Sequence, residues 1–251
     1  MEKAARLKDY SKQTGELFMA IFAISDLHLS KAVNKPMDIF GGGWENYMEK
    51  IEKNWKAAVS VDDWVLVCGD LSWATYLEEA AADFEFLSML PGKKILSKGN
   101  HDYWWATLNK MNKFKEKLGL GDIFFLHNNS FVCDAVGVCG TRGWISPDNP
   151  EYTEHDAKIF DRELGRLELS LKDLESKSRK QTVVMLHYPP FHPEGGSREF
   201  LDLMKGYGVD KCIYGHLHGH AFKDAVEGSV EGIEFILTSC DRLGFEPARL
   251  Y

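Results

Sequence analysis

Residues 93–102 read KKILSKGNHD, an apolar run followed by a glycine and by the polar residues Asn100, His101 and Asp102. The run is short, rich in aliphatic side chains and bounded by glycine, which predicts a β-strand over 93–97. Reactive side chains placed directly after a buried strand are typical of a site at the carboxyl edge of a parallel sheet. The stretch therefore predicts an α/β fold whose site lies at strand ends.

The same arrangement follows four further predicted strands, at residues 18–25, 64–68, 181–186 and 211–214. The polar residues that follow the five strands are Asp26, His28, Asp70, Asn100, His101, Asp102, His187, His216 and His218. A single histidine or aspartate at a strand end is more often a structural or turn residue. Five strands in succession that all end in this way indicate a metal site. Imidazole, carboxylate and amide ligands without thiolate suit Zn, Fe and Mn.

The spacing of these residues favours a shared site. Side chains two residues apart in an extended chain point the same way, so Asp26 and His28 are expected to face one site, as are His216 and His218. There are enough ligands for two metal ions, and Asp70 is a candidate bridge between them. Glycines precede three of the ligand positions, at 69, 99 and 215, and we expect them to let the backbone turn sharply.

The rest of the chain predicts one α/β domain. Further strands are expected at 122–126, 130–139, 220–226 and 233–239, and helices at 44–60, 75–89, 103–118, 153–178 and 197–206. The early strand–helix alternation favours parallel strands, and the later strands, 211–239, favour an antiparallel portion. We expect the domain to span 18–251, with residues 1–17 as an N-terminal extension. Met19 is a candidate natural start, a hypothesis that N-terminal sequencing of natively expressed protein tests.

Composition narrows the class of protein. The chain has 251 residues, 44% of them apolar and 27% charged, which excludes disordered, collagen-like and coiled-coil proteins. Its net charge of −8 makes it a poor partner for long nucleic acid. Five cysteines, an odd number without a C-x-x-C pair, favour a reducing, cytoplasmic location. No apolar run has the length of a membrane helix, so no membrane partner is expected.

Taken together, the motifs Asp-x-His, Gly-Asp, Gly-Asn-His-Asp, His and Gly-His-x-His resemble those of the calcineurin-like metallophosphoesterase superfamily, over residues 26–218. The resemblance implies a four-layer α-β-β-α sandwich with mixed sheets and a dinuclear centre of divalent or mixed-valence ions (Mn, Fe or Zn). It implies one metal held by Asp26, His28, Asp70 and His218, and a second held by Asp70, Asn100, His187 and His216. It further implies that His101 is a catalytic histidine near the leaving group and that Asp102 orients it.

One branch of this superfamily fits less well. The protein Ser/Thr phosphatases continue the second motif as Gly-Asp-x-x-Asp-Arg-Gly, whereas residues 69–73 here read GDLSW. The phosphate-binding arginine of that branch is missing, and Asp241-Arg242 is not in the motif that would replace it. The phosphodiesterase-like branch is therefore favoured.

We expect a hydrolase that cleaves a small phosphodiester or phosphomonoester, with nucleotides as natural candidates, by attack of a metal-bridging hydroxide. His101 would protonate the leaving oxygen. Arg142 and Trp144 are candidate substrate contacts, weighed equally against a surface arginine and a packing tryptophan. The alternatives are a nuclease on the same site and a non-catalytic metal-binding scaffold. The sequence does not indicate an oligomeric state.

Overall fold

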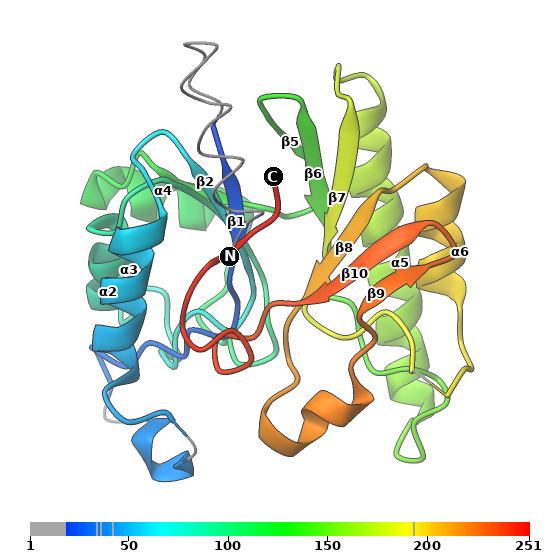
Figure 1. Ribbon diagram of the computed structural model, residues 1–251, viewed down its shortest axis with the longest axis horizontal. Coiled ribbons are helices and arrows are strands. Elements are labelled where there is room, and N and C mark those ends of the chain that lie inside the picture. Colours follow the sequence, from blue (N-terminus) through cyan, green and yellow to red (C-terminus); the bar gives the residue numbers. More distant parts are fainter. Residues whose placement is uncertain (1–18, 34, 36, 42, 193) are drawn as a thin grey trace, which may run out of the picture.

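Two β-sheets pack face to face at the centre of the computed structural model, which describes residues 19–33, 35, 37–41, 43–192 and 194–251 (Figure 1). The first sheet has the order β11-β1-β2-β3-β4. Its strands are β1 (Ile21–Ala23), β2 (Trp64–Cys68), β3 (Lys93–Ser97), β4 (Ile123–Phe125) and β11 (Ala248–Arg249). β1 to β4 are parallel, and β11 adds to β1 in the antiparallel direction. The expected extension, 1–17, lies outside the described residues.

The second sheet has the order β5-β6-β7-β8-β10-β9. Its strands are β5 (Phe131–Cys133), β6 (Val136–Gly140), β7 (Gln181–Met185), β8 (Lys211–Tyr214), β9 (Gly228–Val230) and β10 (Ile233–Leu237). The four inner strands are parallel, and the two outer strands are antiparallel to their neighbours. Both sheets are therefore mixed.

Helices cover the outer face of each sheet, which confirms the expected four-layer fold (Figure 1). α2 (Tyr47–Ala58), α3 (Ala81–Ser88) and α4 (Leu108–Leu118) cover the first sheet, and α5 (Glu154–Glu175) and α6 (Glu199–Gly206) cover the second. Two short 3-10 helices, η1 (Met37–Phe40) and η2 (Gly219–Asp224), lie in connections. No helix in the described part of the chain is both long and apolar enough to cross a membrane.

The inner strands are apolar at successive positions because both of their faces are buried. In β2, Val65 and Val67 pack against the helices, whereas Leu66 and Cys68 face the second sheet. The side chains of β7 also alternate between the two faces of its sheet, and Val183 lies on the face between the sheets. This packing holds the carboxyl ends of strands from both sheets at one edge of the molecule.

Three of the expectations for the strands were wrong in detail. Residues 130–139 form two strands rather than one, because Asp134 adopts a left-handed backbone conformation (φ 55°) and turns the chain back. Residues 220–226 fall largely in η2 instead of a strand. β10 also pairs with β8 in parallel, so antiparallel pairing within 211–239 is confined to the β9–β10 hairpin.

The expected helix over 103–118 begins only at Leu108. Thr107 is its N-cap, and its side chain accepts a hydrogen bond from the backbone N–H of Lys110. α5 matches its expected range closely, because Thr153 and Asp156 form a capping box at its start.

Candidate metal centre

The two sheets bring the seven metal-ligand candidates to one edge of the fold. Asp26 and His28 follow β1, Asp70 follows β2, and Asn100 follows β3. The second sheet supplies His187 after β7, and His216 and His218 after β8. Carboxylates and an amide therefore come from one sheet, and three of the imidazoles come from the other.

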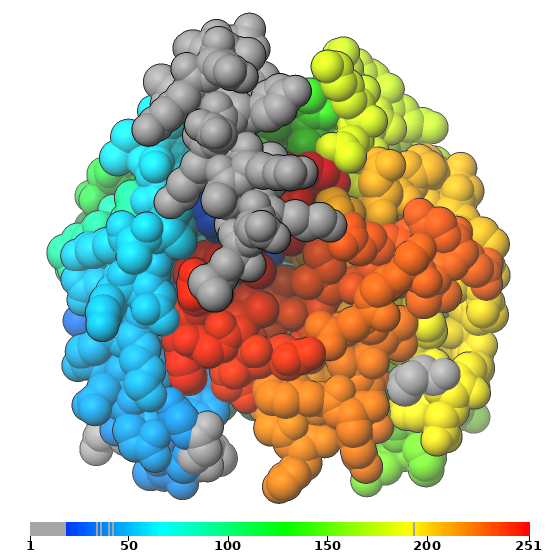
Figure 2. Space-filling model, viewed as in Figure 1, coloured from blue at the N-terminus to red at the C-terminus, as the bar shows by residue number. Residues whose placement is uncertain are grey.

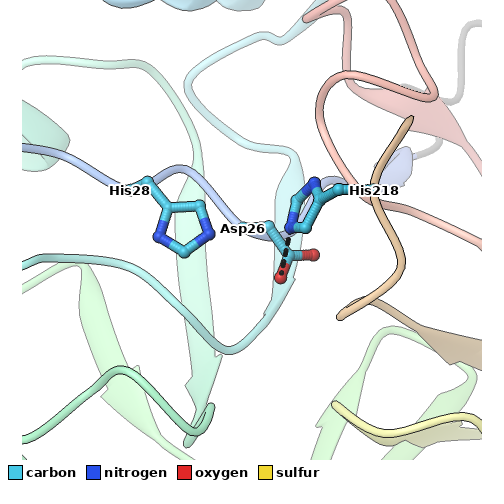
Figure 3. Close-up of side chains that lie close together, drawn as sticks. All are labelled: Asp26, His28 and His218. Carbon is cyan, nitrogen blue, oxygen red and sulfur yellow. Dashed lines mark ion pairs between the residues drawn. The ribbon is translucent and has the colours of Figure 1, made fainter. Parts of the chain in front are cut away.

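One group joins Asp26, His28 and His218, whose ligand atoms all lie within 4.8 Å of one another. Figure 3 shows the two imidazoles and the carboxylate directed toward one another from segments almost 200 residues apart in the chain. Nε2 of His218 is 3.5 Å from Oδ1 of Asp26. Nε2 of His28 is 3.7 Å from Oδ2 of Asp70, so Asp70 also borders this group.

A second group gathers on the other side of Asp70. Nε2 of His187 is 3.6 Å from Oδ2 of Asp70 and 2.6 Å from Oδ1 of Asn100. Nδ1 of His216 is 3.0 Å from the same Asn100 oxygen. Asp26 is near this group as well, because its Oδ1 is 3.8 Å from Nδ1 of His187. Both aspartates thus lie between the two groups of ligand atoms.

The donor set fits a divalent cation. Nδ1 of His187 is 2.9 Å from the carbonyl oxygen of Cys68, so in the neutral ring this nitrogen donates and carries the proton. Nε2 then presents a lone pair toward the oxygens of Asn100 and Asp70. Acceptors that face one another repel unless a positive charge lies among them. Nδ1 of His28 is also buried, without a hydrogen-bond partner in the described part of the chain.

Four of the ligand candidates have a left-handed backbone. The φ angles of Asp26, His28, Asp70 and His216 are 58°, 44°, 52° and 72°. L-residues rarely adopt this region, and each such position costs on the order of 1–3 kcal/mol. Strain concentrated at strand ends that carry ligands indicates that side-chain placement there outweighs backbone preference.

The glycines beside the ligands provide space more than turns, which corrects our expectation for two of them. Gly69 does have a positive φ of 89°. Gly99 does not, but a Cβ atom there would lie 2.0 Å from Oδ1 of Asp70. At Gly215, likewise, a Cβ atom would lie 2.3 Å from a carboxylate oxygen of Asp26. Gly99 and Gly215 are therefore needed because a side chain at either position would collide with the carboxylate of Asp70 or Asp26.

Burial sets the charge of several groups in the site. It lowers the pKa values of His28 and His216 to about 3, so both imidazoles are neutral at neutral pH and free to act as ligands. Burial and the nearby charge of Asp26 raise the pKa of Asp70 well above its ordinary value. The crowding of two carboxylates in a dry site is relieved when a cation binds between them.

Asp102 forms no hydrogen bond to the His101 ring within the described residues, and its expected role in orienting that ring stays a prediction. Its Oδ2 accepts hydrogen bonds from the backbone N–H groups of Gly99 and Asp70, at 2.7 and 2.9 Å. Its Oδ1 accepts from the N–H of Leu71 and the indole N–H of Trp104. The buried carboxylate therefore ties the turn after β2 to the turn after β3, the two segments that carry Asp70 and Asn100.

His101 is partly buried beside His28. Its ring centroid is 5.7 Å from that of His28 and 4.7 Å from that of Trp73. Its Nδ1 has no hydrogen-bond partner among the described residues. Its own backbone N–H donates to Oδ1 of Asp70 at 2.8 Å, which fixes the main chain beside the ligands. The ring is thus placed next to the candidate metal positions and is free to contact a bound molecule.

The sequence model of the calcineurin-like phosphoesterases matches residues 19–220, a range that includes every one of these ligand candidates. The chain belongs to the calcineurin-like phosphoesterase family. Members of this family typically bind divalent metals, and membership supports a hydrolase of phosphoric esters. No curated protein matches the chain.

Solved structures show the same fold at low sequence identity. One is the phosphopantetheinyl hydrolase of Mycobacterium tuberculosis, with 16% identity and a TM-score of 0.51 over 89% of this chain and 90% of that one. Another is TT1561 of Thermus thermophilus, with 20% identity and a TM-score of 0.51 over 80% of this chain and 82% of that one.

Two residues that border the phosphoesterase site were missed from the sequence. Oδ1 of Asp241 is 2.9 Å from Nδ1 of His218, and the carboxylate fixes which ring nitrogen faces Asp26. Asp241 follows β10, so the strand-end pattern that found the other ligands could also have found it. Tyr188 packs against His216 with ring centroids 4.2 Å apart and the ring planes tilted by 40°. No signal in the sequence marked this tyrosine.

The remaining candidates, Arg142 and Trp144, line two different cavities near the candidate metal centre. The Arg142 guanidinium lies 4.2 Å from the centroid of the Trp144 ring. Trp144 lines a cavity of about 720 Å³ that reaches His216 and also has Tyr188 and Phe191 in its wall. Arg142 lines a second cavity of about 400 Å³. Trp144 also packs against the core beneath the second sheet, and a substrate contact by either residue stays a prediction.

Proposed function

We propose that the chain hydrolyses a small phosphodiester or phosphomonoester at a dinuclear metal centre. The observation that carries the proposal is the convergence of candidate ligand atoms from Asp26, Asp70, Asn100 and the surrounding imidazoles. A structural relative of the same fold is itself named a phosphopantetheinyl hydrolase, which is consistent with ester hydrolysis on this scaffold.

The metal ions would be held by the residues of the two groups described above. Asp26, His28, Asp70 and His218 would bind one, and Asp70, Asn100, His187 and His216 would bind the other. When bound, divalent cations supply Lewis-acid chemistry that neutralises charge on a phosphoryl group and lowers the pKa of water.

The cavity of about 720 Å³ is our proposed seat for the organic part of the substrate. Its aromatic wall of Trp144 and Tyr188 is suited to stacking on a base or ring, and its floor reaches His216 in the metal centre. The indole N–H of Trp144 donates to Asp156 at 3.0 Å, so the ring is held in place before a ligand enters. A preorganised wall of this kind limits the entropy lost on binding.

Arg142 is our proposed partner for the phosphoryl oxygens. Its guanidinium offers a planar set of N–H donors, which matches phosphate better than a lysine does. The backbone carbonyl of the same residue accepts hydrogen bonds from the N–H groups of His187 and Tyr188. Arg142 is therefore fixed to the segment that carries a metal ligand.

His101 is our proposed proton donor for the leaving oxygen. Burial and the nearby imidazole of His187 lower its pKa, and the negative charge of a phosphoryl group opposes this effect by favouring the protonated ring. With Asp102 engaged elsewhere, no carboxylate is hydrogen-bonded to this ring in the described residues. The substrate itself would then set the protonation state of His101.

The test compares Mn²⁺-reconstituted protein on bis(p-nitrophenyl) phosphate and p-nitrophenyl phosphate, with a chelator control. We expect turnover that the chelator abolishes. In His101→Ala we expect the same metal content, a small loss of kcat on these esters, whose nitrophenolate leaves without a proton, and a loss of about 10²–10⁴-fold on an ester with an alkyl leaving group, which needs the proton. Absence of turnover in protein shown to hold two metals would contradict the hydrolase assignment. Loss of metal in the His101 variant would instead make His101 a ligand.

A further inference from the structure

The smaller of the two cavities, about 400 Å³ in volume, is a cationic chamber. Its charged lining groups are Lys98, Arg142, Arg166 and a single carboxylate, Glu163. They come from the segments after β3 and β6 and from α5, and the segment after β4 adds His127. In a chain whose net charge is −8, this is a local surplus of positive charge.

The one carboxylate in the chamber does not balance the cations. Glu163 is 1% exposed and is already shared: its Oε2 accepts from the Thr141 hydroxyl at 2.5 Å, and its Oε1 lies 2.7 Å from a guanidinium nitrogen of Arg166. Arg142 reaches the same Oε1 only at 3.5 Å. Lys98 forms no ion pair with any residue that the structure describes. Two cations are therefore weakly compensated.

Arg142 shows the lack of hydrogen-bond acceptors most clearly. Its side chain is 14% exposed and forms no hydrogen bond within the described part of the chain, although a guanidinium carries five N–H donors. Its Nε is fully shielded and without a partner. A buried cation whose donors lack acceptors is costly, and the cost is relieved when an anion binds. Burial and the charge of Arg142 also lower the pKa of Lys98.

The chamber is adjacent to the metal centre. Lys98 precedes the ligand Asn100 by two residues, and two residues of chain span at most about 7 Å. On the opposite side, the carbonyl of Arg142 accepts hydrogen bonds from the N–H groups of His187 and Tyr188. A molecule whose phosphoryl group lies at the centre could thus extend a further anionic group past Arg142.

We propose that the chamber binds a second phosphate group of the substrate. The substrate would then be a small molecule with two phosphates, such as a diphosphate, whose first phosphate reacts at the metal centre. This inference rests on the proposed function and narrows its substrate class. Lys98 and Arg166 are the residues that would contact the second phosphate, and Arg142 would lie between the two phosphates.

The first test measures binding without catalysis. Inorganic phosphate is titrated calorimetrically into the full chain in the presence of a chelator, so that bound metal does not contribute. We expect Arg166→Met to weaken phosphate binding about tenfold, since one charge-assisted contact is removed. The matched control is Arg162→Met, an exposed arginine four residues earlier on α5 that is not part of the chamber lining. We expect it to change the affinity less than about twofold, because an exposed charge is well screened.

The second test asks whether the phosphate belongs to a substrate. Adenosine 5′-monophosphate and adenosine 5′-diphosphate differ by one phosphate, and each is used to inhibit the Mn²⁺-loaded enzyme. We expect the diphosphate to bind more tightly in the native protein, and Arg166→Met to reduce this preference about tenfold. In Arg162→Met the preference should persist.

The outcomes separate the inference from the proposed function. Equal phosphate affinity in the two arginine variants would overturn the chamber as a phosphate site, even if the enzyme turns over its test substrates. Phosphate binding that depends on Arg166, combined with an unchanged preference between the two nucleotides, would overturn its role in the substrate. Phosphate binding that depends on Arg166 in a protein without turnover would retain the chamber and refute the hydrolase.

Discussion

The metal centre and the cationic chamber lie side by side and have opposite requirements. In the centre, the acceptor atoms of Asp70, Asn100 and His187 face one another. In the chamber, Arg142 and Lys98 hold N–H donors and positive charge with too few acceptors. A phosphate ester with bound metal ions satisfies both regions at once. The contrast fits the proposed reaction, in which cations would bind in the centre and an anionic substrate would reach from them into the chamber.

The largest effect is expected at the residue between the two ligand groups. Asp70→Asn keeps the size of the side chain and removes its negative charge, so the repulsion that a cation relieves is lost. Several kcal/mol of transition-state stabilisation would disappear, which corresponds to at least about 10³-fold in kcat/KM. Metal content by atomic emission should fall below that of native protein. Full metal content and activity in this variant would show that the charge of Asp70 is not needed to bind the metal ions.

The next effect concerns the carboxylate that ties the strand ends together. In Asp102→Asn, an amide N–H₂ group replaces one of the two carboxylate oxygens. If it replaces Oδ2, the N–H groups of Gly99 and Asp70 lose their acceptor. If it replaces Oδ1, the N–H groups of Leu71 and Trp104 lose theirs. At least two buried N–H donors lose their partners, and each loss costs about 1–3 kcal/mol. We expect the free energy of unfolding of the metal-free protein to fall by about 3 kcal/mol, measured by urea denaturation. An unchanged midpoint would mean that the turns after β2 and β3 are held in another way.

A smaller effect is expected from the residue that orients His218. Asp241→Ala removes the acceptor for Nδ1–H, so the ring is free to rotate and its ligating nitrogen is no longer fixed. The affinity for Mn²⁺ should fall about 10–100-fold by calorimetric titration. Asp241→Asn keeps an acceptor oxygen and should recover part of this loss. If both variants bind metal equally, the role of Asp241 is general packing.

The smallest effect is expected at His127, which lines the chamber. Burial and the charge of Arg166 lower the pKa of His127 below 6.5. As the pH falls through 6.5, the unfolded chain takes up a proton at this residue that the folded chain does not, so stability is lost. His127→Gln should therefore lose less stability than the native protein between about pH 7.5 and 5.5, by up to about 1 kcal/mol.

The measurement is urea denaturation of the metal-free protein at both pH values. His155→Gln is the control, since His155 is an exposed residue of α5. An equal pH response in native protein and His127→Gln would show that the chamber does not repel a proton.

The strand-end pattern predicted the position of the metal-ligand candidates well, for a physical reason. A strand buried on both faces is an unbroken apolar run, so its end is visible where Asp70 or His187 begins a polar segment. Parallel strands then bring such ends to one edge without any further information. The same rule applied to β10 points to Asp241, which we did not select.

Features that depend on pairing between distant segments were not accessible in this way. The parallel pairing of β8 with β10 is decided by the crossover through η2, which resembled a strand in the sequence. The role of Asp102 depends on the approach of the Gly69 turn, which no local pattern reveals. The chamber is built from residues that are each ordinary alone, such as Lys98 and Arg166, and only their assembly makes them unusual.

Contacts between distant segments also involve the C-terminal segment, residues 221–251, which lies outside the range of the family match. It lies between the two halves of the molecule on the surface seen in Figure 2, with β11 paired to β1 and Asp241 bonded to His218. A chain cut after residue 220 would retain all seven ligand candidates and would still lose part of the first sheet and the support of one ligand.

The left-handed backbone at Asp26, His28, Asp70 and His216 has a consequence for protein engineering. Glycine at any of these positions removes conformational strain, and it also removes one of the buried carboxylates or imidazoles that crowd the centre. Selection for heat resistance alone would therefore favour variants that discard the ligands. A directed-evolution campaign on this enzyme needs a screen for bound metal or turnover in every round, because thermostability and activity compete at the same four residues.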